Sequence, residues 1–432
     1  MEKLKYILYY VIIFTCVGMA VTLEELIQQN IYTNPQIKAS IANYKISKYE
    51  LEKVSSGYSP TLDITAEIGR ERTKIDYGFE GHQILNEQQL ALVGRYNLFE
   101  GYKTTYKLKE KESAIDIAKH QLFQKISKVT LFMTEVYLEL LRKKALLEIE
   151  EENYQNHLQT LNKVRLRLEA GDGYESDYRQ SNARLKLAEG NRLLAKRAYL
   201  NTQINYRRFL AKVPIIGTME RPMVSLNIRV SDIEKYMQMA KDKNFNLHIQ
   251  KSQIEESKSL YQQEKSKYYP TIDVEISQSW NNNIHGVEGN DNSQKIVLLM
   301  NYNLYNGRAD QASQLSALKR TEMQEGELDN INLDVEEELR LALMKYNLLE
   351  RQLELGSEQL GYLKGTKELY ELEYQYSKRT IIDVLNIKQE YSYAQAQKIN
   401  AEYDQLLAYY QFKSIIGGLM DEFHLDEILE YL

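Results

Sequence analysis

Residues 34–63 read NPQIKASIANYKISKYELEKVSSGYSPTLD, and residues 244–273 read NFNLHIQKSQIEESKSLYQQEKSKYYPTID. Both stretches end in an aromatic residue, a spacer, Pro, Thr, an apolar residue and Asp, a run that opens a strand-like segment. A second segment is also repeated: Tyr96-Asn-Leu-Phe-Glu-Gly101 recurs about 206 residues later as Tyr302-Asn-Leu-Tyr-Asn-Gly307. The repetition predicts two long tandem units, and function must come from what they build together.

We expect each unit to run helix, strand, strand, long helix, tight turn, helix. Pro60 and Pro270 stand at matched points where helix gives way to strand, and Pro214 and Pro222 bracket the break between the units. The expected organisation is one protomer with a first repeat at 21–210, a linker at 211–231, a second repeat at 232–418 and a C-terminal tail at 419–432.

The first residues have the pattern of a cleaved signal peptide. Lys3 and Lys5 precede an apolar stretch from Tyr6 to Val17, and small residues follow at the expected cleavage positions. We therefore interpret residues 1–20 as a signal peptide, which contains the chain's only cysteine, Cys16. The alternative is a lipoprotein acylated at Cys16, but the residues before Cys16 are poor lipobox residues.

Composition excludes two classes of protein. With 43% hydrophobic residues, 27% charged residues and a mean hydropathy of -0.52, the chain is too polar for a helical membrane protein. The net charge is -6, and no basic patch is present, so we expect no nucleic-acid partner.

No pattern in the sequence predicts an enzyme. The six histidines have no metal-ligand spacing, and no glycine-rich loop links a strand to a helix as phosphate binding requires. Ser316-Ala-Leu-Lys319 matches a Ser-x-x-Lys pattern, but it lies on a charged helix without companion motifs and is explained by chance. We expect no catalytic activity, no cofactor and no metal.

Four segments alternate between apolar and polar residues, as half-exposed strands do. Their apolar positions are Leu62, Ile64, Ala66 and Ile68; Leu90, Leu92, Tyr96 and Leu98; Ile272, Val274 and Ile276; and Ile296, Leu298, Met300, Tyr302 and Leu304. Such strands, roughly 10 residues long, are typical of a transmembrane β-barrel with lipid outside and water inside. A soluble half-buried sheet is the alternative. We expect polar exterior loops at Arg72–Glu87 and Asn281–Ser293.

Four strands cannot close a barrel, because hydrocarbon does not tolerate an unpaired edge. Several copies must contribute strands, and three copies would supply about twelve. Helices from Tyr102 to about Ala170 and from Arg308 to about Tyr376 would each be roughly 100 Å long and need lateral support. A seven-residue apolar seam that includes Leu339, Tyr346 and Leu353 predicts paired coils, a pattern that a coiled-coil rod would share.

The expected fold class is mainly α with a β-barrel portion: long coiled-coil hairpins and four transmembrane strands per chain in a trimeric α/β barrel. Two tight turns break the helices, at Glu169–Glu175 and Tyr376–Asp383. We expect capping boxes there, formed by Asp172 with Glu175 and by Thr380 with Asp383, and the two turns would form one tip.

The whole mature chain resembles the TolC family of outer-membrane channel proteins. The matching pieces are the Thr22-Leu-Glu-Glu-Leu opening, the two Pro-Thr-x-Asp strand entries, the strand exits at Leu98–Gly101 and Leu304–Gly307, and the turns. The most specific match is Tyr374-Gln-Tyr-Ser-Lys-Arg379-Thr-Ile-Ile-Asp383-Val-Leu-Asn386. The resemblance implies a homotrimer in which a twelve-stranded barrel continues into a periplasmic tunnel of twelve helices, in the outer membrane of a Gram-negative bacterium.

The resemblance also implies a gate. In the family an aspartate at the position of Asp383 forms a ring around the axis; one turn on, this chain has Asn386, which is neutral. Links that hold the closed state map onto Tyr374 with Asp177 and onto Arg379 with Ser176. The structural alternative is that Asp383 and Asp177 only cap helices and that Tyr374 only packs in the seam.

The turns correspond to the family's adaptor-docking surface. They contain Gly171, Asp172 and Gly173 in the first turn and Ser377, Lys378 and Arg379 in the second, with Ser377 where a glycine is usual. The implied partners are a periplasmic adaptor (membrane fusion) protein, an inner-membrane RND or ABC transporter and outer-membrane lipid. The expected function is a passive exit duct for small molecules or an unfolded protein. The alternative is a secreted or surface coiled-coil structural or adhesive protein without a pore.

Overall fold

The computed structural model describes four stretches of the chain: residues 22–75, 81–210, 219–224 and 228–425. The chain forms two compact units, each assembled from separate segments. Unit 1 contains residues 1–34, 126–243 and 336–432, and unit 2 contains residues 35–125 and 244–335. Each unit therefore draws on both sequence repeats. The expected signal peptide at 1–20, and parts of the expected linker and tail, lie outside the described residues.

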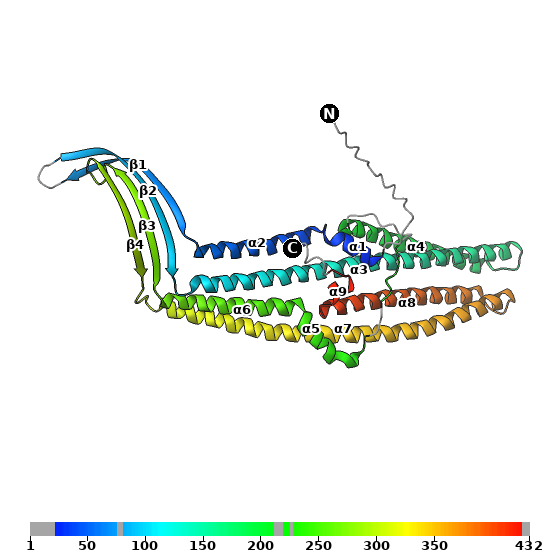
Figure 1. Cartoon of the computed structure of the whole chain (residues 1–432). Coiled ribbons are helices and arrows are strands. Elements are labelled where there is room, and N and C mark those ends of the chain that lie inside the picture. The colour runs from blue at the N-terminus through cyan, green and yellow to red at the C-terminus, as the bar shows by residue number, and fades with distance from the viewer. Residues whose placement is uncertain (1–21, 76–80, 211–218, 225–227, 426–432) are drawn as a thin grey trace, which may run out of the picture. The chain divides into compact units, whose positions relative to one another are not determined.

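The elements follow the order that the repeat predicts (Figure 1). In chain order they are α1 (Leu23–Ile31), α2 (Pro35–Ser55), η1 (Ser56–Tyr58), β1 (Thr61–Ile75), β2 (Gly81–Phe99), α3 (Lys103–Glu169), α4 (Glu175–Leu210), η3 (Val230–Asp232), α5 (Ile233–Lys243), α6 (Phe245–Lys265), η4 (Ser266–Tyr268), β3 (Thr271–Asn282), β4 (Asn290–Asn301), α7 (Ala309–Gln375), α8 (Ile381–Ile415) and α9 (Leu419–Glu422).

Unit 2 contains an antiparallel sheet with the strand order β1-β2-β3-β4. Its register places the predicted apolar positions on one face: Leu62 pairs with Gly94, Gly94 with Ile276, and Ile276 with Ile296. These side chains are exposed, at 71% for Leu62 and 79% for Ile296. The alternation predicted from the sequence is therefore confirmed, and the apolar face of the sheet is uncovered in the single chain.

The predicted loops are wrong in extent. β1 continues to Ile75 and β2 begins at Gly81, while β3 and β4 leave only residues 283–289 between them. The added strand residues are mostly polar. They can still form strands, because neighbouring strands are held together by backbone hydrogen bonds, which do not depend on apolar side chains. At the other end β4 stops at Asn301, so the last two apolar positions assigned to it, Tyr302 and Leu304, follow the strand.

Helices α3, α6 and α7 lie side by side in unit 2. Gln263 of α6 donates from Nε2 to Glu110 Oε2 of α3 over 2.9 Å. Gln250 of α6 donates from Nε2 to the backbone oxygen of Gln324 of α7 over 2.8 Å. The helical layer of this unit is thus joined by polar contacts as well as by apolar packing.

Unit 1 is helical and has its own core. One cluster joins Tyr236 of α5, Leu339 and Leu343 of α7, and Phe412 and Ile416 near the end of α8. The predicted seam of α7 is confirmed at Leu339 and Tyr346, which are buried, and Leu343, which the seam did not include, is buried as well. The seam continues as half-buried positions along the second half of α7.

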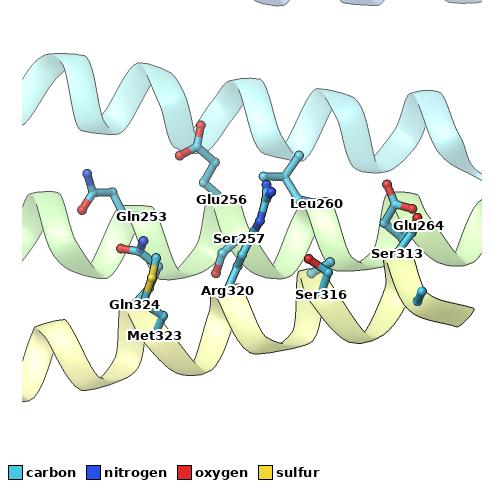
Figure 2. A pocket seen from close by; sticks show the side chains of 12 residues that line it. Gln253, Glu256, Ser257, Leu260, Glu264, Ser313, Ser316, Arg320, Met323 and Gln324 are labelled. Carbon is cyan, nitrogen blue, oxygen red and sulfur yellow. The ribbon is translucent and has the colours of Figure 1, made fainter.

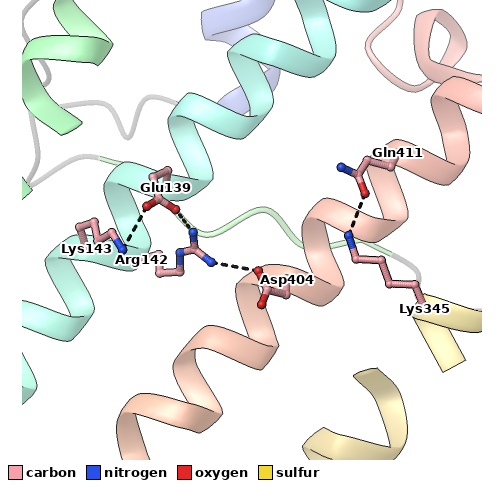
Figure 3. Close-up of polar contacts among 6 residues, drawn as sticks. All are labelled: Glu139, Arg142, Lys143, Lys345, Asp404 and Gln411. Atoms are coloured by element: carbon pink, nitrogen blue, oxygen red, sulfur yellow. Dashed lines mark hydrogen bonds and ion pairs between the residues drawn. The ribbon is translucent and has the colours of Figure 1, made fainter. Parts of the chain in front are cut away.

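Polar contacts add to this packing between α3, α7 and α8 (Figure 3). Arg142 of α3 donates from Nη1 to Asp404 Oδ1 of α8 over 2.9 Å and also pairs with Glu139 of its own helix. Lys345 of α7 donates to Gln411 Oε1 of α8 over 3.1 Å. Such half-exposed pairs contribute little free energy but fix which helix faces lie opposite each other.

The segment between the repeats is fastened to α3 by one tyrosine. Tyr137 is fully buried, its hydroxyl donates to the Glu220 backbone oxygen over 2.7 Å, and the Glu220 N–H donates to the same hydroxyl over 3.1 Å. Burial raises the pKa of the Tyr137 hydroxyl, which stays protonated. The next residue, Arg221, pairs with Glu402 Oε2 of α8 over 2.8 Å.

We expect Tyr137→Phe to loosen this segment, because the backbone of Glu220 loses two hydrogen bonds, at a cost of about 1 kcal/mol each. Cleavage after Glu220 by a glutamyl endopeptidase in the folded protein should accelerate, as measured by gel electrophoresis over time. Tyr362→Phe is the control, since Tyr362 on α7 is 80% exposed. Equal cleavage in the wild type and in Tyr137→Phe would contradict the anchoring role.

Candidate functional site

The two helix turns of unit 1 share one backbone geometry. At the α3–α4 turn, Gly171 N–H donates to Leu168 O over 3.0 Å and Asp172 N–H to Arg167 O over 2.9 Å. At the α7–α8 turn, Ser377 N–H donates to Tyr374 O over 3.1 Å and Lys378 N–H to Glu373 O over 2.9 Å. These bonds satisfy the last carbonyl groups of each long helix in the same way.

Both turns need one residue in the left-handed conformation. Gly171 has a φ of +79° and Ser377 a φ of +56°. Glycine adopts this conformation without a steric penalty, whereas serine has a Cβ atom that crowds the following carbonyl. The serine noted in the sequence therefore keeps the turn that a glycine would make, at a cost in backbone strain.

One of the two predicted capping boxes is confirmed. The Thr380 hydroxyl accepts from Asp383 N–H over 3.3 Å, and the Asp383 carboxylate accepts from Thr380 N–H over 3.2 Å, at the start of α8. The other box is wrong, because α4 begins at Glu175 and Tyr174, not Asp172, precedes it. Asp172 instead approaches Arg167 of the preceding helix, with Nε and Oδ2 3.9 Å apart.

An apolar cluster joins the two hairpins beside these turns. It consists of Val164 of α3 and Ile381, Val384 and Leu385 of α8, all at least nine-tenths buried. Half-buried aromatic rings surround it: Tyr178 of α4, and Tyr370 and Tyr374 of α7. We call this set the apolar tip cluster. The sequence signal for it is the spacing of Ile381, Val384 and Leu385 directly after Thr380.

A concave site of about 560 Å³ lies between the two turns. Many predicted residues meet in it: its lining includes Gly171, Asp172, Gly173, Asp177, Tyr374, Ser377 and Arg379. The predicted residues Ser176, Lys378, Asp383 and Asn386 do not line it. The lining contains two arginines, Arg167 and Arg379, and two aspartates, so the site is polar and has no large excess of either charge.

Tyr374 has a partner that the sequence did not reveal. The Arg167 guanidinium of α3 lies over its ring, 4.8 Å from the centroid, a cation–π contact between the two hairpins. Tyr374 and Asp177 line the same concave site, but no hydrogen bond joins them within the described chain. Their predicted link remains a prediction.

Arg379 is held by its own hairpin. Its Nε donates to Glu373 Oε2 over 2.8 Å, and its guanidinium lies 4.0 Å from the ring centroid of Tyr370. The hydrogen bond to Glu373 raises the pKa of Arg379 further, so the side chain stays charged. In this chain the exposed Ser176 does not bond to Arg379, and that predicted link also stays a prediction.

Asp383 and Asn386 lie on the first turns of α8. Hydrogen bonds from the Thr380 hydroxyl and N–H lower the pKa of the Asp383 carboxyl below its ordinary value, so it is ionised at neutral pH. Asn386 Oδ1 accepts from Arg184 Nη2 of α4 over 3.2 Å. The cap role of Asp383 is therefore present in one chain, and an axial ring would need further copies.

Unit 2 carries a groove between α6 and α7 with a volume of about 840 Å³ (Figure 2). Small side chains on α7 make the room, and the polar lining includes Glu256, Glu264 and Arg320. It includes no histidine, and the hydroxyl of Ser257 donates to the Ile254 backbone oxygen over 2.7 Å. We assign no chemistry to it.

Two histidines of unit 2 stack on each other. His120 of α3 and His248 of α6 lie face to face with ring centroids 4.9 Å apart. Burial lowers the pKa of His120 to about 4, so it is neutral at physiological pH. Among the described residues, no group of three or more potential ligands could hold a metal.

The comparisons with known proteins agree with this architecture. The sequence profile described as outer membrane efflux protein matches residues 26–212 and 236–418. The chain belongs to the outer membrane efflux protein family, which confirms the resemblance found in the sequence and the expected place in the outer membrane. No curated protein matches the sequence. Within the described residues, no helix is both long and apolar enough to cross a membrane.

Solved structures share the fold at low sequence identity. A membrane protein from Pseudomonas aeruginosa has a TM-score of 0.81 at 12% identity, covering 92% of this chain and 90% of that one. The outer membrane protein VceC from Vibrio cholerae has a TM-score of 0.78 at 14% identity, covering 92% and 96%. The Campylobacter jejuni CmeC outer membrane channel has a TM-score of 0.78 at 13% identity, covering 92% and 86%. The predicted fold class is confirmed.

The two turns give a reciprocal test of backbone strain. We expect Ser377→Gly to stabilise the protein by about 1 kcal/mol, because the left-handed residue loses its Cβ. Gly171→Ala should destabilise it by about 1 kcal/mol through the backbone alone, since nothing lies within 4 Å of the added Cβ. Thermal unfolding in mild detergent measures both. A fall in the midpoint for Ser377→Gly would show that its side chain makes a contact that outweighs the strain.

Proposed function

We propose that this chain is the outer-membrane exit duct of a tripartite export system and conducts substrate passively. The observation that carries the proposal is the sheet of unit 2. One face exposes large apolar side chains, including Leu62, Ile68, Ile276 and Ile296. The other face carries mostly polar and charged side chains, with Val93, Val297 and Leu299 as apolar exceptions. An exposed apolar area of this kind is unfavourable in water and favourable against lipid.

The open edges of the sheet support assembly from several copies. β1 and β4 lie at its two edges and have 15 and 12 residues, so each leaves a long row of backbone groups unpaired. Pairing β1 of one copy with β4 of the next satisfies both rows and closes a barrel. Three copies give about twelve strands, within the range of membrane barrels. The alternative, a coiled-coil structural or adhesive protein without a pore, does not explain a sheet with an exposed apolar face.

The tips of unit 1 are suited to act as the gate. Parting the hairpins would expose the apolar tip cluster and separate Arg167 from Tyr374, so the closed arrangement is favoured without a partner. In a trimer, Asp383 would form a ring of charge and Asn386 a neutral ring, and Tyr374 and Arg379 would reach Asp177 and Ser176 of a neighbouring copy. Opening would then need both kinds of contact to be lost.

The partners follow from the duct role. The exposed turns, Gly171–Gly173 and Ser377–Arg379, would receive a periplasmic adaptor (membrane fusion) protein. Energy would come from an inner-membrane RND or ABC transporter, and the substrate would be a small molecule or an unfolded protein. Lipid would surround the sheet, and no nucleic acid is involved.

Assembly is the first test of this function. In mild detergent the purified mature protein should have the mass of about three chains and should migrate faster before heating than after, as closed barrels do. Native mass spectrometry and electrophoresis measure this. A stable monomer that does not partition into membranes would exclude the duct.

The gate is tested by conductance in planar bilayers. Tyr374→Phe keeps the ring beneath Arg167 and removes only the hydroxyl, and Arg379→Ser removes the guanidinium. We expect the double variant to conduct more than the wild type, because the tips lose bonds to neighbouring copies.

Glu373→Gln is the matched control. It weakens the in-chain partner of Arg379 but leaves Arg379 in place, so we expect conductance near that of the wild type. Equal increases in conductance in the control and in the double variant would contradict the gate contacts. They would show that conductance depends on the shape of each hairpin and not on contacts between copies.

A further inference from the structure

The loop between β3 and β4, residues 283–289, is closed on itself. Asn283 N–H donates to Gly289 O over 2.8 Å, and Gly289 N–H donates to Asn283 Oδ1 over 2.9 Å. Asn283, His285, Gly286 and Gly289 all have positive φ, which turns the chain back sharply. We call this loop the strap. Its internal bonds give it a defined shape.

The strap is fastened to the other two strands. Gly286 N–H donates to Glu71 Oε2 of β1 over 3.1 Å, and the other oxygen of Glu71 accepts from the Thr73 hydroxyl over 2.8 Å. Asn283 Nδ2 donates to the Asn86 backbone oxygen of β2 over 3.2 Å. A Cβ on Gly286 would lie 2.8 Å from Thr73 Cβ, so only glycine allows this approach. The strap therefore crosses β2 and contacts β1.

The strap lies on the polar face of the sheet. Glu71 and Thr73 alternate in step with Asp63 and Thr65, opposite to the apolar positions. Exposure follows the same division near the turn end of the β1–β2 hairpin: residues 69, 71, 73, 85, 87 and 89 are half-buried, and residues 70, 72, 84, 86 and 88 are exposed. Only the polar face is covered.

The register explains why the strap can reach so far. Asn282, the last residue of β3, pairs with Gln88 of β2, yet the β1–β2 ladder continues to the pair Ile75 and Gly81. The first hairpin thus extends past the end of the second. A loop pointing straight out would leave that extension bare, whereas the strap folds inward against it.

We propose that the strap is a second constriction of the duct, at its outer mouth, which limits the size of solutes entering from outside. The inference rests on the proposed function, in which the polar face lines the water-filled interior. Three straps would then lie across the opening at the hairpin-turn end of the strands, independent of the gate at the helix tips. Exposed His285 and Glu288 would face the passing solute.

The test measures access to the interior from outside. Ser277 lies on the polar face of β3, deeper than the strap, and Ser277→Cys would be the only thiol once the segment containing Cys16 is removed. Two reporters carry this cysteine, one with the intact strap and one with residues 283–289 replaced by Asn-Gly, which favours a tight hairpin turn. Cells carrying each are treated with a small impermeant maleimide or with a maleimide on a polyethylene glycol chain.

The small reagent should label both reporters at equal rates. The bulky reagent should label the reporter with the shortened loop roughly tenfold faster than the reporter with the intact strap. This factor is expected if the intact strap leaves room for the bulky reagent about a tenth of the time. Gly286→Val should act like the deletion, and Val287→Ala, at a 65% exposed position, like the wild type.

The outcomes separate this inference from the proposed function. Equal labelling of both reporters by the bulky reagent would overturn the constriction and leave the duct intact. Failure of the small reagent to reach Ser277→Cys in either reporter, with folded trimers present, would show that the polar face does not line an open interior, and the duct itself would fail.

Discussion

Backbone hydrogen bonding in an apolar medium is the constraint on which the rest of this structure depends. Hydrocarbon offers no partner to the free edges of β1 and β4, so a chain with an apolar sheet face cannot be complete alone. The same requirement explains why so few strands accompany so much helix. Each copy needs to supply only its share of a closed wall, and the remaining chain is available for the helical hairpins.

The helices meet a different limit. α3 and α7 each have 67 residues, roughly 100 Å, and a helix of that length is stable only with partners along its sides. Apolar seams supply most of that support, and polar contacts such as Arg142 with Asp404 select the facing surfaces. At the tips the balance changes, since a small apolar cluster is surrounded by half-buried tyrosines, and arginines lie against two of these rings. A contact of this composition can be separated and re-formed.

Several features set by neighbouring residues were predictable from the sequence, although the Asp172–Glu175 box, predicted by the same local rule, did not form. The Thr380–Asp383 box needs only two residues one turn apart, and strand alternation needs only a period of two. The loops were overestimated because polarity was taken to end a strand, whereas pairing with the other strand of the hairpin carried it on. Arg167 over Tyr374 and Gly286 against Thr73 were not predicted, because each joins residues about 200 positions apart and no local pattern marks such contacts.

The two turns of unit 1 share their backbone bonds but not their charge. The first, Gly171-Asp172-Gly173, carries one negative charge, and the second, Ser377-Lys378-Arg379, carries two positive charges. In a three-fold assembly the turns would alternate around the rim, giving six electrostatic sectors of alternating sign. A docking protein of matching pattern would find only three rotational positions of low energy, separated by repulsive ones. The backbones of the six turns would be nearly equivalent, so backbone shape alone would allow six orientations of a docking protein. The difference in charge between the two repeats would reduce these to three.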